Sequence, residues 1–435
     1  MIDISTAAVG FLILLALMGA GVYVAVAMLF VSLLGAVLYL GWPVALDLGT
    51  QYWGATSGFV LTAVPLYILL GELLVRGGFT DRMYKALSDW LTVLPGGLLH
   101  TNVCASSMFA AISGSSVATA ATISTMALPS LKGRGYDPRL VLGSIAAGAT
   151  LGILIPPSIN LIVYGAMTGS SVGKLYMGGM VPGLLLTLFF MAYIFIACTI
   201  TPSRMGTKDK PDPLPVRLRR TLDLLPPTIV FVIVMGSIYL GWATPTESAA
   251  LGVTVSLIMC AMARRLTFSM LNECLLRTIS TTAMIMLIMV GAFFMTFVLS
   301  MLNLPQTLAD YVTSLGTSKA MLILLLTIFY LILGCFLEAL AMLIGTVPIV
   351  YPMVVAVGID PIWFGVYLII MCGLALITPP VGMILYVVQG VRREGSITTV
   401  ISGTMPFLWT MAAFVLLISI FPEIVTWLPS IAYGG

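Results

Sequence analysis

Apolar runs of about 20 residues recur along the whole chain, and this pattern restricts its fold more than any other feature. A helix of that length crosses the hydrocarbon core of a membrane. Of the 435 residues, 60% are hydrophobic and 8% are charged. A soluble domain carries roughly 25% charged residues, because it faces water on all sides. The composition therefore predicts an all-α, polytopic membrane protein.

The chain offers few groups for catalysis or for a metal centre. Its six cysteines lie scattered in apolar stretches without a CxxC pair, and its one histidine is His100. Residues 169–175 resemble a phosphate-binding loop, but the segment is one residue short and ends in leucine instead of serine or threonine. The serines within 113–116 lack the sequence frame and the histidine base of a serine hydrolase. We therefore expect no enzyme activity, no cofactor and no ATP site.

A hydrophilic stretch at residues 201–223 divides the chain into two halves that repeat one another. Three proline landmarks of the first half recur in the second, each at nearly the same distance along the chain. They are 129 and 348, 156–157 and 379–380, and 182 and 406, at offsets of 219, 223 and 224 residues. Because all three matches occur in the same order, they indicate an internal repeat.

The repeat predicts the organisation of the chain, with about five spans plus one re-entrant hairpin in each half. Residues 1–200 form the first repeat, with its hairpin at about 96–130 and a broken helix at about 140–169. Residues 226–435 form the second repeat, with its hairpin at about 320–351 and a broken helix at about 362–390. Residues 201–225 form a basic linker between the two repeats.

The distribution of lysine and arginine predicts the orientation in the membrane. The linker carries six basic residues, which places it in the cytoplasm. Counting spans outward from it then puts 17 of the 19 basic residues on the cytoplasmic side, and only Lys174 and Lys319 on the other. Both termini fall in the periplasm. The two halves therefore cross the membrane in opposite directions, which makes the repeat inverted.

Each half holds two interrupted apolar segments at matching places, which is the pattern of a transporter's central binding site. They are residues 112–119 and 154–160 in the first half, and 333–338 and 373–380 in the second. Two consecutive prolines remove two amide donors, so a continuous helix cannot pass. The freed carbonyls need a cation, a water or a polar side chain as partner. Oxygen ligands suit an alkali cation, and half-helix N-termini suit a carboxylate.

Each of these features also has a plain structural explanation. A double proline can be a simple kink, and small residues favour helix packing in lipid. Their occurrence in both halves, in the same order, favours a functional site. Glu338 is predicted to be functional because a carboxylate inside a membrane is costly, although a protonated or hydrogen-bonded structural role is the alternative.

Four segments together resemble the large membrane subunit of tripartite ATP-independent periplasmic (TRAP) transporters. The resemblance covers essentially the whole chain. The most specific segments are the hairpin sequence AISGSSVATAATI and the motif ATPTESAA, and the two double-proline breaks complete the set. They occupy residues 111–123, 243–250, 155–158 and 377–382.

The resemblance implies an elevator-type transporter, with a scaffold domain and a mobile transport domain, in the bacterial inner membrane. It implies Na⁺-driven uptake of small organic acids, such as dicarboxylates, that a soluble periplasmic binding protein delivers. It also implies a small four-helix membrane subunit as partner. Membrane lipid surrounds the chain, and we expect no nucleic-acid partner.

The family motifs also imply positions for two Na⁺ sites. The first falls on Ser113, Ser115 or Ser116 together with Gly152, Ile155 and Pro157. The second falls on Gly334 together with Gly373 and Thr378, largely through backbone oxygens. For the substrate side we select Thr119 and Asn160, which the family motif does not fix, and add Glu338.

Two other functions compete with this interpretation. One is an ion-coupled anion transporter of related architecture that needs no binding protein. The other is a non-transporting membrane subunit of an energy-converting complex. The latter would need quinone-binding or proton-path residues, and His, Lys and Arg are nearly absent from the apolar spans.

The distribution of basic residues makes a prediction about orientation. A cysteine placed at Ser203 should resist a membrane-impermeant thiol reagent in intact cells, because residues 201–225 are predicted to be cytoplasmic. A cysteine at Gly435 should react, since the C-terminus is predicted to be periplasmic. Labelling of the Ser203 variant in sealed cells would refute the orientation.

Overall fold

The chain folds almost entirely into α-helices, which confirms the predicted fold class. The computed structural model describes residues 4–206, 212–335 and 337–433. The first half contains α1 (Ile4–Gly19), α2 (Val24–Gly35), α3 (Trp42–Leu46), α4 (Leu48–Thr56), α5 (Ala63–Arg76), α6 (Phe79–Leu91), α7 (Leu98–Ser113), α8 (Ser116–Leu131), α9 (Pro138–Thr150), α10 (Ile159–Thr168) and α11 (Val172–Ile200). The second half contains α12 (Leu214–Thr221), α13 (Leu225–Tyr239), α14 (Pro245–Met262), α15 (Phe268–Met301), α16 (Leu304–Ser314), α17 (Lys319–Gly334), α18 (Ala339–Ala356), α19 (Pro361–Leu376), α20 (Met383–Arg392), α21 (Ile397–Ile420) and α22 (Glu423–Tyr433).

Seven helical segments are long and apolar enough to cross a membrane, judged by length and composition within the described residues. A π-helical turn over Ala36–Leu40 extends α2, and a 3₁₀ turn over Phe59–Thr62 precedes α5. Several further apolar helices have 10 to 17 residues, too few for one of them to span the hydrocarbon core alone. Apart from Ala8–Gly19 and Val24–Leu40, these shorter helices border the positions predicted to be interrupted.

The first pair is α7 and α8, which the turn Gly114-Ser115 separates. Gly114 has a φ of 59°, a left-handed conformation that a residue without Cβ adopts at little cost. Ser115 then begins α8 as its N-cap, because its Oγ accepts a hydrogen bond from the Ala118 amide at 3.4 Å. The corresponding helices of the second half are α17 and α18, which end at Gly334 and begin at Ala339.

The second pair in each half is an interrupted helix. α9 continues as a 3₁₀ turn over Leu151–Ile153, the chain then passes the double proline, and α10 begins at Ile159. In the second half, α19 ends at Leu376 and α20 begins at Met383 after the prolines at 379–380. The breaks lie at the prolines because proline supplies no amide donor and clashes with the preceding turn.

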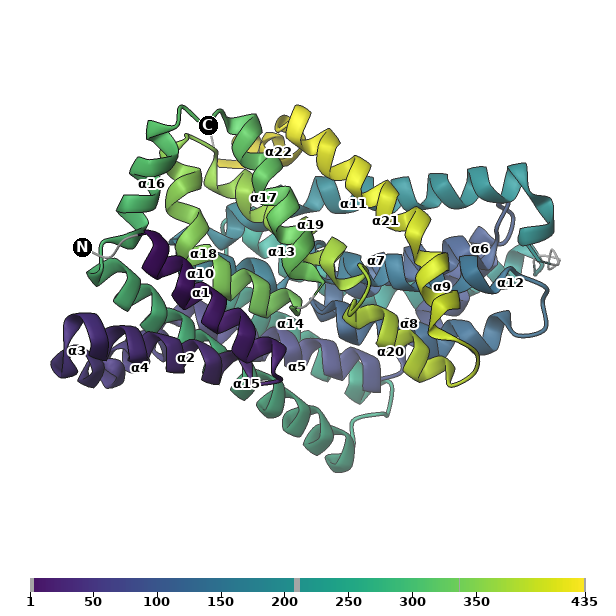
Figure 1. Cartoon of the computed structure of the whole chain (residues 1–435). Helices are drawn as coiled ribbons and strands as arrows, with labels where there is room; N and C mark the ends of the chain where they lie inside the picture. Colours follow the sequence, from purple (N-terminus) through teal and green to yellow (C-terminus); the bar gives the residue numbers. More distant parts are fainter. Residues whose placement is uncertain (1–3, 207–211, 336, 434–435) are drawn as a thin grey trace.

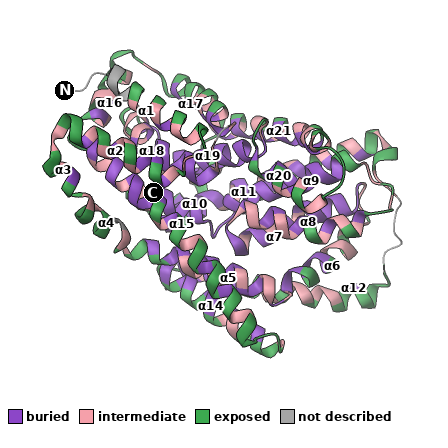
Figure 2. Ribbon diagram, turned by 60° about the horizontal axis from the view of Figure 1, so that its bottom comes forward, coloured by how far each residue is buried: buried purple, intermediate pink, exposed green. Residues whose placement is uncertain are grey.

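The two interrupted helices form the centre of the molecule. Every residue from Leu140 to Thr150 in α9 and from Trp363 to Leu376 in α19 is buried. Figure 2 shows this buried band, with α7 and α10 alongside it. A second set of helices packs mainly within itself, through the pairs α2 with α15, α5 with α14 and α13 with α14. Figure 1 places α1 and α16 toward one end of the molecule and α6 and α12 toward the other.

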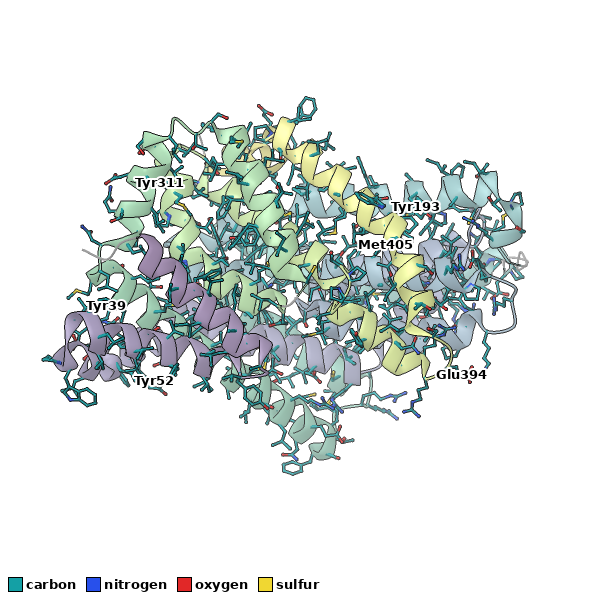
Figure 3. The ribbon with its side chains drawn as sticks, in the orientation of Figure 1. Tyr39, Tyr52, Tyr193, Tyr311, Glu394 and Met405 are labelled. Atoms are coloured by element: carbon teal, nitrogen blue, oxygen red, sulfur yellow. The ribbon has the colours of Figure 1, made fainter. Side chains whose placement is uncertain are left out.

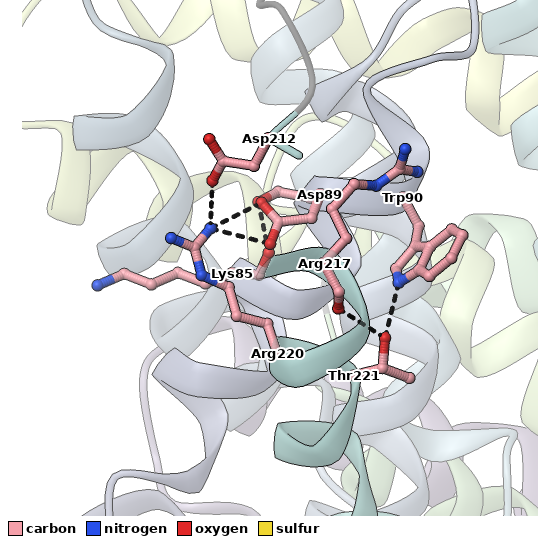
Figure 4. A network of polar contacts seen from close by, with 8 residues as sticks. Lys85, Asp89, Trp90, Asp212, Arg217, Arg220 and Thr221 are labelled. Atoms are coloured by element: carbon pink, nitrogen blue, oxygen red, sulfur yellow. Dashed lines mark hydrogen bonds and ion pairs between the residues drawn. The ribbon is translucent and has the colours of Figure 1, made fainter. Parts of the chain in front are cut away.

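A polar network joins α6 to α12 at that second end, and Figure 4 shows it from close by. Arg220 Nη1 donates to both carboxylate oxygens of Asp89, at 3.1 and 2.9 Å, and to Asp212 at 2.7 Å. The guanidinium of Arg217 lies 4.4 Å from the centre of the Trp90 ring, a cation–π contact. The network thus fastens part of the basic linker to the helix that precedes the first hairpin.

Glycine allows α9 and α21 to cross with their backbones in contact. A Cβ on Gly143 would lie 2.1 Å from the carbonyl oxygen of Gly403, and one on Gly403 would lie 2.0 Å from the carbonyl oxygen of Arg139. No Cβ fits at either distance. Small residues at such crossings allow the close helix packing that stabilises membrane proteins.

This crossing predicts a large loss of stability in Gly143→Ala. The added methyl group must push α21 away from α9, and overpacking of this kind costs about 1–3 kcal/mol or more. Gly236→Ala in α13 is the matched control, because its Cβ would meet nothing within 4 Å. Thermal unfolding of the two purified variants measures the difference. Equal melting temperatures would contradict the crossing.

Candidate functional site

The tip of the first hairpin lies directly against the first helix break. A Cβ on Gly152 would lie 2.8 Å from the carbonyl oxygen of Ser115 and 2.8 Å from Thr119 Oγ1. A Cβ on Gly114 would lie 2.8 Å from the carbonyl oxygen of Pro157. Glycine at both positions therefore lets the hairpin and the break touch. The fold brings together five of the sequence-predicted residues, which are Ser113, Ser115, Thr119, Gly152 and Pro157.

Hydroxyl and carbonyl oxygens converge at this contact. Ser113 Oγ and Thr119 Oγ1 lie 3.2 Å apart, and Thr119 Oγ1 also donates to the carbonyl oxygen of Ser115 at 2.7 Å. Ser116 is buried, and its Oγ finds no hydrogen-bond partner among the described residues. A buried hydroxyl without a partner is costly, so a bound group is the natural partner for it. An alkali cation accepts oxygen ligands of this kind.

Within the first break, one backbone carbonyl accepts a hydrogen bond from a nearby side chain. Ser158 Oγ donates a hydrogen bond to the carbonyl oxygen of Ile153, which has lost its helical donor. Ile155 is buried, and it packs where α11 approaches, since a Cβ on Gly183 would lie 2.6 Å from Ile155 Cγ1. A Cβ on Gly179 would lie 2.9 Å from the carbonyl oxygen of Leu154. α11 therefore shields the break from lipid.

The second hairpin contacts the second break in the same manner. A Cβ on Gly334 would lie 2.3 Å from the Cβ of Ala375 in α19. Cys335 Sγ donates to the carbonyl oxygen of Pro379 at 3.3 Å. Thr378 Oγ1 donates to the carbonyl oxygen of Leu374 at 2.7 Å. Gly334 therefore packs on α19 three residues before Thr378, and a shared cation site for the two stays a prediction.

Gly373 lies elsewhere on α19, at the crossing with the first half. A Cβ there would lie 3.5 Å from Thr150 Cβ in α9 and 2.9 Å from Met411 Cε in α21. Gly373 and Ala375 are two positions apart, so their side-chain directions differ by about 200° around the helix. The structure therefore places Gly373 between the two breaks, and its Cβ direction points away from Gly334.

The two residues chosen for the substrate side occupy different surroundings. Thr119 is buried within the hydroxyl cluster of the first hairpin. Asn160 is buried in the first turn of α10, and its Nδ2 has no hydrogen-bond partner among the described residues. Because α10 packs against α18 of the second half, Asn160 lies on an element that joins both halves. Its free amide donors are suited to a carboxylate.

Glu338 is the N-cap residue of α18, and it is partly buried. Its position at a helix N-terminus is favourable for a carboxylate, because the helix dipole is positive there. Cys372 Sγ of α19 lies 3.6 Å from the carbonyl oxygen of the adjacent Ala339. The acid therefore lies close to the second hairpin contact, not to the hydroxyl cluster of the first.

Two residues beside the site were missed by sequence reasoning. A Cβ on Gly71 of α5 would lie 3.2 Å from Ser113 Cα, so α5 packs directly on the first hairpin tip. Thr150 meets Gly373 at the crossing described above. A glycine within the apolar α5 sequence is a weak indication of close packing, whereas nothing near Thr150 in the sequence indicates its contact.

The motif ATPTESAA has a structural role at the start of α14. Thr244 and Glu247 form a capping box, in which the Thr244 amide donates to Glu247 Oε2 at 2.7 Å. Thr246 Oγ1 donates to the carbonyl oxygen of Phe59 at 3.2 Å, which ties α14 to the turn before α5. These contacts belong to the second packing set, away from the hairpin tips.

The fold and the site define a membrane transporter built around paired hairpins and broken helices. A solved structure, that of the Alcanivorax borkumensis YdaH transporter, shares this fold with a TM-score of 0.58 and 15% identity, over 86% of this chain and 88% of that one. Residues 11–424 match the family described as tripartite ATP-independent periplasmic transporter, DctM component.

Curated relatives agree with that match. The sialic acid TRAP transporter large permease protein SiaM of Vibrio cholerae is 33% identical over 428 residues, covering 97% of both chains. The C4-dicarboxylate TRAP transporter large permease protein DctM of Pseudomonas aeruginosa is 34% identical, covering 88% of this chain and 89% of its own. The chain therefore belongs to the TRAP transporter large permease family, and it is a multi-pass inner-membrane protein.

The hydroxyl cluster predicts a specific effect of Ser116→Ala. If Ser116 Oγ contacts a cation, its loss should weaken apparent Na⁺ affinity by about fivefold to a hundredfold, because a hydrogen bond or ligand contact to a charge is worth roughly 1–3 kcal/mol. Ser113→Ala should act in the same direction. Uptake measured against Na⁺ concentration in proteoliposomes gives both values.

Thr246→Ala serves as the control for this measurement. Thr246 is buried like Ser116, but its hydrogen bond lies at the start of α14. Its loss should leave Na⁺ affinity within about twofold of the original, since it removes packing and not a ligand. If the serine variants keep the original Na⁺ affinity while Thr246→Ala loses it, the assignment of the ion site to the first hairpin is wrong.

Proposed function

We propose that this large permease drives uptake of small organic acids by Na⁺ symport, with one Na⁺ site at each hairpin contact. The observation that carries this proposal is that a hairpin tip packs on a helix break in each half, at Gly152 and Ser115 in the first and at Gly334 and Ala375 in the second. The first tip contributes hydroxyl and carbonyl oxygens, and at the second the Cys335 thiol donates to the carbonyl oxygen of Pro379 in the break. Transporters with inverted repeats bind their ions and substrates at such places.

Matching contacts between the two halves support an inverted repeat. α8 packs on α20, and α18 packs on α10, so the second arm of each hairpin touches the interrupted helix of the other half. In the same way, α9 packs on α21 and α19 packs on α11. Reciprocal pairs of this kind are what a twofold axis between the halves produces. We therefore propose the same division as the sequence predicts, with repeats at 1–200 and 226–435 and a linker at 201–225.

The packing also supports an elevator mechanism. The hairpins and interrupted helices pack mainly with one another, together with α11 and α21. A second set consists of α1, α2, α5 and α13–α15. Its helices pack mainly with one another, with α14 and α15 at the centre of the set. We assign the first set to the mobile transport domain and the second to the scaffold. We also propose that both termini lie in the periplasm and the linker in the cytoplasm. This orientation is supported by α1 and α12, which lie toward opposite ends of the molecule (Figure 1).

For the substrate we propose a small carboxylate. Relatives carry the names of sialic acid and C4-dicarboxylate transporters, and both ligands are carboxylic acids. Asn160 and the N-terminus of α10 supply donors for such a group in the first half, and the start of α20, which follows the second double proline, is the equivalent in the second. A soluble periplasmic binding protein and a small four-helix membrane subunit complete the proposed transporter.

The coupling ion can be tested directly. Proteoliposomes that contain this chain, its small membrane partner and its binding protein should accumulate the acid when Na⁺ is outside, with or without ATP. Replacement of Na⁺ by K⁺ should abolish accumulation, because the oxygen clusters then lack the coupling ion. Equal uptake in K⁺ would refute Na⁺ symport. Equal uptake without the binding protein would instead favour a self-sufficient transporter.

A further inference from the structure

A cavity of about 550 Å³ lies between α8, α9 and α20, away from the hairpin tips. Its walls are largely apolar, formed by residues such as Leu128, Pro129, Leu142 and Val391. A space of this size admits a small organic molecule. Two of the residues that line it carry a buried polar atom without a partner, and these give the cavity its chemistry.

The first of these is Ser124 of α8. It lines the cavity and is fully buried, and its Oγ has no hydrogen-bond partner among the described residues. The second is Arg392, the last residue of α20, which also lines the cavity. Its Nη1 is buried, and in the described part of the chain it meets no acceptor. A buried guanidinium N–H requires an acceptor, and an oxyanion is the group whose geometry it matches.

The other charges at the cavity leave Arg392 uncompensated. Lys132 Nζ lies 3.8 Å from Glu394 Oε1 at the rim, and both side chains are 79% exposed. Figure 3 shows Glu394 just beyond the end of α20. This rim pair is neutral overall, while the described residues supply no carboxylate to Arg392. The cavity therefore carries one unpaired positive charge at its polar side.

The position of the cavity relates it to the candidate ion site. α8 begins at the hydroxyl cluster, and Ser124 lies eight residues after Ser116, about 12 Å farther along the helix. α20 begins just after the second break, and Arg392 lies nine residues after Met383, about 14 Å away. Lys132 and Arg392 both belong to the group of basic residues predicted to be cytoplasmic. The cavity thus extends from the middle of α8 toward the cytoplasmic end.

We propose that this cavity is a cytoplasmic release site, in which Arg392 and Ser124 hold the carboxylate of the transported acid after it leaves the hairpin tips. The assignment rests on the proposed transport of carboxylates. Arg392 supplies two parallel N–H donors to the carboxylate, Ser124 supplies a hydroxyl donor, and the apolar walls accommodate the carbon skeleton. The ligand class is a small organic carboxylate.

A thiol-labelling experiment tests this site without requiring transport. Thr125 lines the cavity and is exposed, so Thr125→Cys is labelled with an anionic and a cationic methanethiosulfonate reagent in the purified complex in nanodiscs. The rates are compared with those of the parent, which has the six native cysteines. Arg392→Gln should lower the ratio of the anionic to the cationic rate about tenfold, because a nearby charge is lost. Arg392→Lys should restore most of that ratio.

The matched control is Arg393→Gln. Arg393 is adjacent and exposed but does not line the cavity, so its loss should change the ratio by less than about twofold at physiological salt. Succinate or sialic acid should slow anionic labelling of Thr125→Cys, and Arg392→Gln should remove this protection. Equal ratios and equal protection with and without Arg392 would overturn the proposal.

Lipid composition separates the carboxylate from a lipid phosphate. Protection in neutral phosphatidylcholine nanodiscs that depends on added acid supports the release site. Protection that appears only with anionic phospholipid, without any added acid, overturns it in favour of a lipid headgroup. Labelling results that depend on Arg392 in a chain without Na⁺-driven uptake would refute the proposed function alone. Normal uptake with no effect of Arg392 would refute the release site alone.

Discussion

Lipid supplies no hydrogen-bond partner to a broken helix, and this constraint decides how the hairpins and the interrupted helices are arranged. Two consecutive prolines leave backbone carbonyls without donors. In the first half Ser158 donates to the carbonyl oxygen of Ile153, and in the second half Cys335 donates to the carbonyl oxygen of Pro379 within the break. The breaks must also be covered by protein, so each hairpin tip packs on a break and α11 shields the first from lipid. The most polar parts of the backbone therefore meet at the centre of the molecule, where a transporter needs them.

Glycine makes these contacts possible. Gly152, Gly114 and Gly334 lie at points where a Cβ would be within 3 Å of the opposite element. Gly143 and Gly403 allow α9 and α21 to approach equally closely. Since lipid gives no hydrophobic drive for two helices to associate, close packing and interhelical polar contacts must stabilise the assembly. The same approach that stabilises the fold also brings Ser115 and Thr119 to the first break, so packing and site formation have one cause.

In the proposed transport cycle, a carboxylate that leaves the hairpin tips passes a region that holds it more weakly. The cavity between α8, α9 and α20 offers one unpaired guanidinium within largely apolar walls. A single charge-assisted contact at a partly open cavity attracts an anion without trapping it, whereas the proposed central site would combine two helix N-termini with Na⁺.

The sequence by itself determined the all-α membrane fold and the positions of the two helix breaks. Composition required lipid as solvent, and proline chemistry fixed the two breaks to within a few residues of 156–157 and 379–380. Serine and glycine at 113–116 marked the hairpin tip for the same local reason. Only the tertiary structure decided that Gly373 faces Thr150 of the other half, that Gly71 packs on Ser113, and that Arg392 and Ser124 share one cavity. These contacts join residues far apart in the chain, and apolar helices of similar composition can pack in many registers. Local sequence patterns therefore specify which elements form, while steric fit between helices specifies which residues meet.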